Sequence, residues 1–171
     1  MLALKPTLTT LVITLWVAMI SACGSTSINK KHELFARDPD IAAAQVYFIR
    51  PYTYRERGLA DNPVKIEING KQLMELGKGE YTMARMKPVK ISLTTRSLTL
   101  FTNKIEPVEM TRTSEITLAP DERYFLHVKQ VNEEFRGVYY MIELVSLETA
   151  KGLINGVKSI GVPRKAAIDK L

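Results

Sequence analysis

The chain offers few side chains of the kinds that perform catalysis or hold metals. It contains one cysteine, Cys23, and two histidines, His32 and His127. A single thiol cannot form an intramolecular disulfide. No cysteine or histidine cluster has the spacing of a zinc site, and no run of carboxylates has the spacing of a calcium loop. We therefore predict that the protein binds no metal and needs no cofactor.

Catalysis by the remaining side chains also lacks a recognisable arrangement. No serine lies in a Gly-x-Ser-x-Gly turn, and no phosphate-binding loop is present. The adjacent carboxylates Glu133 and Glu134 fall among polar residues, which is typical of a solvated turn rather than a glycosidase pair. His127 lies in a strand-like stretch, where a lone histidine is more often structural than a base. We predict no catalytic residue, and keep as the alternative a hydrolase that uses Glu80, Glu133 or Glu134.

The position of Cys23 gives its thiol a different role. Lys5 is the only charged residue before Cys23, and the uncharged run 7–22 is mostly apolar and ends in the small residues Ser21 and Ala22. A charged start, an apolar run and small residues at a cleavage point form a secretory signal. The run is shorter than the ~20 residues that a transmembrane helix needs. Residues 1–22 are therefore predicted to be a removable signal, with an uncleaved membrane anchor as the weaker alternative.

The segment Ile20-Ser21-Ala22-Cys23 resembles the lipobox of bacterial lipoproteins. That resemblance implies that the Cys23 thiol receives a diacylglycerol, that the chain is cut before Cys23, and that the protein is held on a membrane, because two or three acyl chains anchor firmly. Gly24 stands where an aspartate tends to retain such proteins at the inner membrane. The expected location is therefore the cell envelope, on the outer membrane facing the periplasm. The alternative is an ordinary signal followed by a buried free cysteine.

Charge and length limit the partners and the number of domains. The 171 residues include 24 basic and 18 acidic side chains, a formal charge of +6. This length favours one domain, and the positive charge favours anionic partners such as phospholipid head groups, although a mildly basic surface explains it as well. The basic residues are scattered, which argues against nucleic acid. The expected partner is another envelope protein, peptidoglycan or anionic lipid.

Strand patterns dominate the middle of the chain. Residues 64–68 alternate apolar and charged side chains and run into Asn69-Gly70, a strong hairpin signal. Residues 146–155 are the one helical stretch, with Ser146 as the N-cap and Gly156 as the stop. Short strands with turns between them predict an antiparallel β-sandwich or open barrel with one short C-terminal helix. The expected strands are 45–50, 64–68, 72–76, 80–83, 87–95, 99–103, 115–118, 124–131 and 138–145.

The regions on either side of these strands are polar. We predict a lipidated flexible tether at 23–40, the β-rich domain at 41–160, and a loosely ordered polar tail at 161–171.

Part of the domain resembles a family of small bacterial proteins known only as a domain of unknown function, often found on predicted lipoproteins. The matching pieces are Val46-Tyr47-Phe48-Ile49-Arg50-Pro51, Ile66-Glu67-Ile68-Asn69-Gly70-Lys71 and Gly79-Glu80-Tyr81-Thr82. The chain departs from the family at Lys87-Pro88-Val89-Lys90, where the family has a Pro-Gly-His turn. The similarity covers about fifty residues. It implies the fold class and brings no activity or catalytic residues.

The loop that follows the first strand gathers arginines and tyrosines. Arginine forks bind phosphate or carboxylate, and tyrosines supply flat amphipathic area for sugar or protein contact. The alternative is a solvated loop whose tyrosines pack back on the sheet edge. The candidate contact residues are Arg50, Tyr52, Tyr54, Arg55 and Arg57.

Overall fold

The computed structural model describes residues 27–53, 62–99, 106–133 and 137–161. Cys23, Tyr54, Arg55, Arg57 and Glu134 lie outside these ranges, as does almost all of the predicted tail. The described elements are β1 (Ala44–Arg50), β2 (Val64–Ile68), β3 (Lys71–Leu76), β4 (Glu80–Met86), β5 (Lys90–Thr99), β6 (Val108–Thr117), β7 (Arg123–Glu133), β8 (Gly137–Val145), α2 (Leu147–Leu153) and β9 (Lys158–Ser159).

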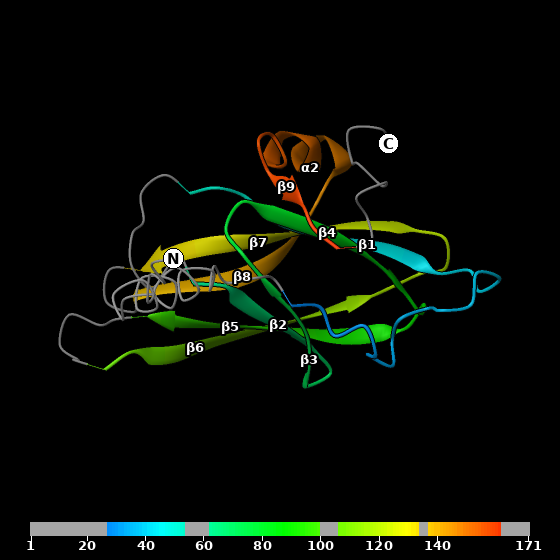
Figure 1. Cartoon of the computed structure of the whole chain (residues 1–171), viewed down its shortest axis with the longest axis horizontal. Helices are drawn as coiled ribbons and strands as arrows, with labels where there is room; N and C mark the ends of the chain where they lie inside the picture. Colours follow the sequence, from blue (N-terminus) through cyan, green and yellow to red (C-terminus); the bar gives the residue numbers. More distant parts are fainter. Residues whose placement is uncertain (1–26, 54–61, 100–105, 134–136, 162–171) are drawn as a thin grey trace, which may run out of the picture.

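The strands form two sheets that pack face to face (Figure 1). One sheet has the order β8-β7-β1-β4-β9, and the other has the order β3-β2-β5-β6. The prediction of a mainly β sandwich with one short helix near the C-terminus is confirmed. The expectation of purely antiparallel pairing is corrected, because β1 runs parallel to β7 and β4 runs parallel to β9. Short turns imply only antiparallel neighbours, and no local pattern indicates these parallel pairs between distant strands.

Strand β1 is buried on both faces, which explains its nearly continuous apolar sequence. Val46 and Phe48 point into the core between the two sheets. Tyr47 and Ile49 point to the opposite face, where they pack with Ala150 of α2. The helix therefore covers the outer face of the five-stranded sheet (Figure 1).

The predicted turn and helix signals act as expected. Asn69 and Gly70 have φ of 50° and 75° and join β2 to β3, because a tight hairpin turn needs positive φ at both positions. The Ser146 hydroxyl accepts a hydrogen bond from the Thr149 amide at 3.2 Å and caps α2. The helix ends at Leu153, slightly earlier than predicted.

The boundaries of β5 and β6 differ most from the prediction. Strand β5 is one ten-residue strand that ends at Thr99, where the sequence predicted one strand at 87–95 and a second at 99–103. Residues 100–103 lie outside the described part. Strand β6 begins at Val108 rather than at residue 115. Threonine, serine and charged residues fill one face of both strands, so apolar alternation alone underestimated their length.

The predicted flexible tether at 23–40 is corrected from Ser27 onward. Residues 27–36, here called the N-terminal segment, lie against the edge of β3 and then cross to β4. The Asn29 amide donates to the Leu73 carbonyl at 2.7 Å, and the Ser27 carbonyl accepts from the Glu75 amide at 2.9 Å. Further along the segment, the Ala36 amide donates to the Arg85 carbonyl at 3.0 Å.

Apolar side chains explain why this segment packs rather than remaining a tether. Ile28, Leu34 and Phe35 pack against the core between the sheets, and Ala36 is buried. Polar residues outnumber these apolar ones in the segment, so its composition alone is typical of a tether. The segment closes the side of the sandwich where β3 and β4 lie.

Candidate functional site

Arg50, a predicted surface contact, points into the protein. It is the last residue of β1 and continues the inward face of Val46 and Phe48, so its guanidinium lies between the sheets with 2% of its surface exposed. It donates to the carbonyls of Asn62 at 2.9 Å and Leu76 at 2.8 Å. Arg50 therefore connects the end of β1 to the end of β3 and to the residues before β2, and its guanidinium is not exposed for contact with a partner.

The Arg50 guanidinium also contacts an aromatic ring. It donates to the Tyr140 hydroxyl at 2.9 Å and lies 4.6 Å from the centre of the Tyr140 ring. The same hydroxyl donates to Gln130 Oε1, which accepts a second hydrogen bond from Thr53, both at 3.1 Å. These contacts connect β1, β7 and β8 through polar groups at one end of the core.

Tyr52 is the one other candidate of this loop within the described residues. It is 52% exposed, and its ring lies against Gly79, where an added Cβ would fall 2.1 Å from Tyr52 Cζ. This placement is the one that the alternative interpretation of the loop predicted for its tyrosines. The structure thus separates Arg50 from Tyr52, and the other three candidates lie outside the described residues.

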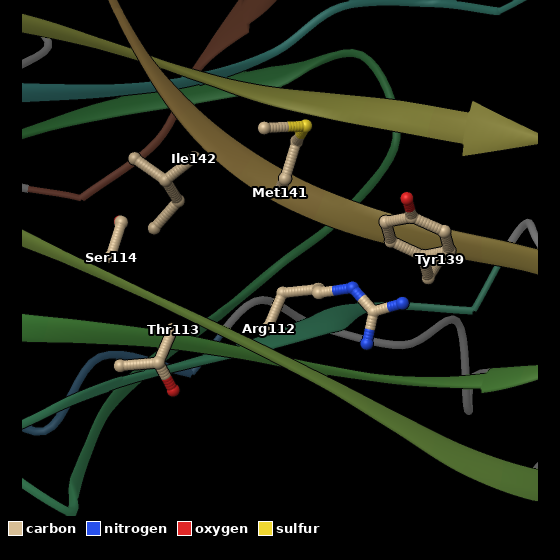
Figure 2. Close-up of a pocket in the computed structure, with 6 residues that line it drawn as sticks. All are labelled: Arg112, Thr113, Ser114, Tyr139, Met141 and Ile142. Carbon is tan, nitrogen blue, oxygen red and sulfur yellow. The ribbon is translucent and has the colours of Figure 1, made fainter.

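Edge strands β6 and β8 meet along one side of the sandwich, and their side chains form a different candidate site, here called the seam site. A small open cavity of about 140 Å³ lies there (Figure 2). Arg112 reaches across from β6, and its guanidinium lies 4.1 Å from the centre of the Tyr139 ring. The lining residues are Arg112, Thr113, Ser114, Tyr139, Met141 and Ile142.

Hydroxyl groups of β5 fix the position of β8 beside this cavity. Thr95 Oγ1 donates to the Tyr140 carbonyl, and the Val138 amide donates to Thr99 Oγ1 at 3.0 Å. The opposite sheet thus satisfies two backbone groups of an edge strand. Further along β8, Met141 and Leu144 are 39% and 56% exposed. Hydrogen bonds from β5 therefore hold the seam site in place near Val138 and Tyr140, and the site is open to solvent near Met141.

The seam site combines residue types that are enriched where proteins recognise partners. Arginine, tyrosine and methionine are over-represented at interfaces, and a cation over an aromatic ring pre-positions both groups. No motif in the sequence marks these residues. Arg112 occupies an inward position in a strand that is rich in threonine and glutamate. Its contact with Tyr139 forms only because the two sheets pack together, and no local sequence pattern predicts that packing.

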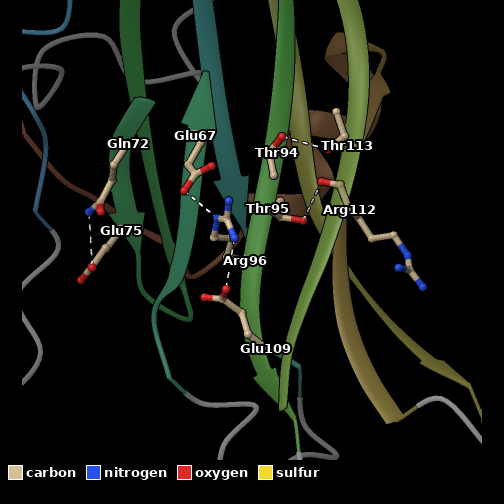
Figure 3. A network of polar contacts seen from close by, with 9 residues as sticks. All are labelled: Glu67, Gln72, Glu75, Thr94, Thr95, Arg96, Glu109, Arg112 and Thr113. Atoms are coloured by element: carbon tan, nitrogen blue, oxygen red, sulfur yellow. Dashed lines mark hydrogen bonds and ion pairs between the residues drawn. The ribbon is translucent and has the colours of Figure 1, made fainter. Parts of the chain in front are cut away.

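The outer face of the four-stranded sheet is mostly polar and ion-paired (Figure 3). Arg96 Nε lies 2.6 Å from Glu67 Oε1, and Arg96 Nη1 lies 3.1 Å from Glu109 Oε2. Next to them, the hydroxyls of Thr94 and Thr113 are 2.9 Å apart. The side chains of Arg96 and Glu109 are 36% and 44% exposed, and that of Glu67 is more buried at 15%. Ion pairs that solvent reaches contribute little to stability.

The two histidines occupy structural positions. His32 is 3% exposed, and its Nδ1 accepts from the Leu34 amide at 3.3 Å within the N-terminal segment. His127 lies in β7 opposite Glu143 of β8. Burial lowers the pKa of His127, and the Glu143 charge partly opposes this effect. Neither histidine is hydrogen-bonded to a serine in the part of the chain that the structure describes.

Of the carboxylates of the hydrolase alternative, Glu80 and Glu133 lie apart, and Glu134 lies outside the described residues. Glu80 accepts from the Gly77 amide at 2.8 Å and stands opposite Arg50 in the sheet. Glu133 ends β7 and accepts from the Tyr139 hydroxyl. The β1–β7 register places Glu133 five residues beyond the level of Arg50, or roughly 17 Å at 3.3 Å per residue. These two carboxylates therefore do not form a general acid and base pair.

Within the described ranges, no group of three or more histidine, cysteine, aspartate or glutamate side chains could hold a metal ion. Among the same residues, none of the helices has both the length and the apolar character to cross a membrane.

Comparison of the chain with protein-family models, with curated proteins and with solved structures found no match. The resemblance of residues 44–95 to a domain of unknown function therefore stays a prediction.

Proposed function

We propose that the protein is a membrane-anchored lipoprotein of the cell envelope whose β-sandwich is a non-catalytic binding module. The observation that carries this proposal is the relation between the seam site and the N-terminal segment. Cys23, the proposed lipid attachment point, precedes this segment by a few residues. The segment lies beside β3 and β4, whereas β6 and β8 are the opposite outermost strands of the two sheets.

This arrangement separates anchoring from recognition. With the lipid on the β3 side, the seam site is on the side of the sandwich turned away from the anchor. Its composition suits a protein partner, because Arg112 and Tyr139 supply a cation and a flat ring, and Met141 adds adaptable apolar area. We therefore favour another envelope protein over peptidoglycan as the partner.

The anchor is tested by Cys23→Ala. The substitution is expected to abolish labelling by a palmitate analogue and to leave the signal uncleaved, because the thiol is the acceptor of the lipid. Labelling that persists in the variant would contradict lipidation at Cys23.

The seam site is tested by site-specific photo-crosslinking in intact cells. A photoreactive residue replaces Met141, and the matched control replaces Leu98, which is similarly exposed at 42% but lies on the outer face of the other sheet. We expect a discrete crosslinked protein from position 141 and none from position 98. No product from position 141, the same products from both positions, or crosslinking to peptidoglycan alone would overturn the proposed protein contact.

A further inference from the structure

The N-terminal segment leaves little free chain between the proposed lipid and the folded domain. Ser27 already accepts a hydrogen bond from β3, and only four peptide units separate it from Cys23. An extended chain spans at most ~3.6 Å per residue, so Ser27 lies within about 14 Å of Cys23. A tether that reached residue 40 would allow about 60 Å. A lipid on Cys23 therefore holds the domain close to the bilayer surface.

Basic side chains lie in the N-terminal segment and beside it, at the start of β3 and after the end of β4. Lys30 and Lys31 are exposed in the N-terminal segment, Lys71 begins the adjacent strand β3, and Lys87 follows β4. Among the described acids nearby, Glu33 lies 2.9 Å from Lys71, and Glu75 lies beside Ser27, because its amide donates to the Ser27 carbonyl at 2.9 Å. The hydrogen bond and charge of Lys71 lower the pKa of Glu33, whose carboxylate is also influenced by Lys87.

We propose that the basic face, defined as Lys30, Lys31, Lys71 and Lys87, rests on anionic phospholipid head groups. This inference rests on the proposed lipid anchor and adds a defined orientation to it. Ammonium groups attract anionic head groups over roughly a Debye length, about 8 Å at physiological salt. The short connection keeps the N-terminal segment, and with it Lys30 and Lys31, close to the bilayer surface. The seam site, on the opposite side of the sandwich, then faces away from the membrane.

The orientation is measured with the full lipidated protein in vesicles that contain a nitroxide-labelled head-group quencher. Cys23 is acylated, so a single introduced cysteine carries the fluorophore, either at Gln72 of β3 or at Leu144 of β8. In vesicles with one quarter phosphatidylglycerol, we expect quenching to be at least about three-fold stronger at position 72. In wholly zwitterionic vesicles, or in 0.5 M salt, this ratio should approach one, because screening removes the attraction.

Charge variants identify the contact. Lys30→Gln with Lys31→Gln should lower the quenching ratio at least two-fold, whereas the matched control, Lys90→Gln with Lys129→Gln, should leave it unchanged. Both pairs are exposed surface substitutions. Equal quenching at positions 72 and 144, or a ratio insensitive to lipid charge, would overturn the orientation while the lipid anchor stands. Absence of lipid on Cys23 would overturn both proposals.

Discussion

Arg50→Met tests whether the guanidinium between the sheets stabilises the fold rather than serving a partner. Methionine keeps a long, flexible side chain and removes all the donors. The substitution leaves the Leu76 carbonyl, which belongs to a fully buried residue, without its Arg50 donor. The Asn62 carbonyl belongs to an exposed residue and can exchange to water. The Tyr140 hydroxyl keeps its hydrogen bond to Gln130.

The magnitude follows from these three contacts. A hydrogen bond to a charged group contributes about 1.5–3 kcal/mol, and an unsatisfied buried carbonyl costs about 1–3 kcal/mol. Removal of the guanidinium also relieves its own desolvation, which offsets part of the loss. We therefore expect Arg50→Met to lower the free energy of unfolding by about 3–4 kcal/mol. In a domain of this size, that lowers Tm by roughly 10 °C or more.

Urea unfolding followed by circular dichroism measures this change. The matched control is Arg96→Met, which removes an arginine and two ion pairs from the solvated outer face. We expect the control to shift the urea midpoint much less. If Arg50→Met loses less than about 1 kcal/mol, or no more than Arg96→Met, the buried contacts do not stabilise the fold as argued.

Two further predictions concern β7 and the turn before β4. Burial lowers the pKa of His127, so the unfolded chain binds a proton at a higher pH than the folded protein does. The contribution of His127 to the free energy of unfolding is therefore fully present above pH 6.5 and decreases as the pH falls below that value. His127→Gln should flatten this pH dependence of the urea midpoint, measured from pH 7.5 to 5. An unchanged slope would contradict the assignment. Gly79 has φ of 70°, so Gly79→Ala incurs about 1–2 kcal/mol of backbone strain and also displaces the Tyr52 ring. Its destabilisation should therefore be smaller in a Tyr52→Ala background, and equal losses in both backgrounds would show that the ring yields freely.

The elements that depend on neighbouring residues were predictable from the sequence. Asn69-Gly70 specifies its hairpin through positive φ, and Ser146 specifies the start of α2 through its hydroxyl. Pairings between distant segments were not predictable. Neither the parallel contact of β1 with β7 nor the docking of residues 27–36 on β3 has a local signature, because both depend on which apolar faces meet after collapse.

The candidate contact residues illustrate the same limit. The sequence places Arg50 next to a polar loop, which suggested a surface position. Arg50 is instead the last residue of β1, and the alternation of side chains along that strand directs it into the core. Arg112, in contrast, lies among residues typical of a solvated strand, and only the approach of β8 brings its guanidinium over Tyr139. Sequence alone therefore singled out Arg50, whose side chain is buried, and not Arg112, which lines the seam site.

The central position of β1 has a kinetic consequence. Its two neighbours in the sheet are β4, 30 to 42 residues later in the chain, and β7, 78 residues later. Bringing such distant strands together lowers the conformational entropy of the chain before the new contacts stabilise it. Folding is slower for this reason. Strand β1, in which six of seven residues are buried, is also among the first to be synthesised, and it remains without its β7 partner until most of the chain has followed. The interval before β7 arrives is therefore when the nascent chain is most prone to aggregate.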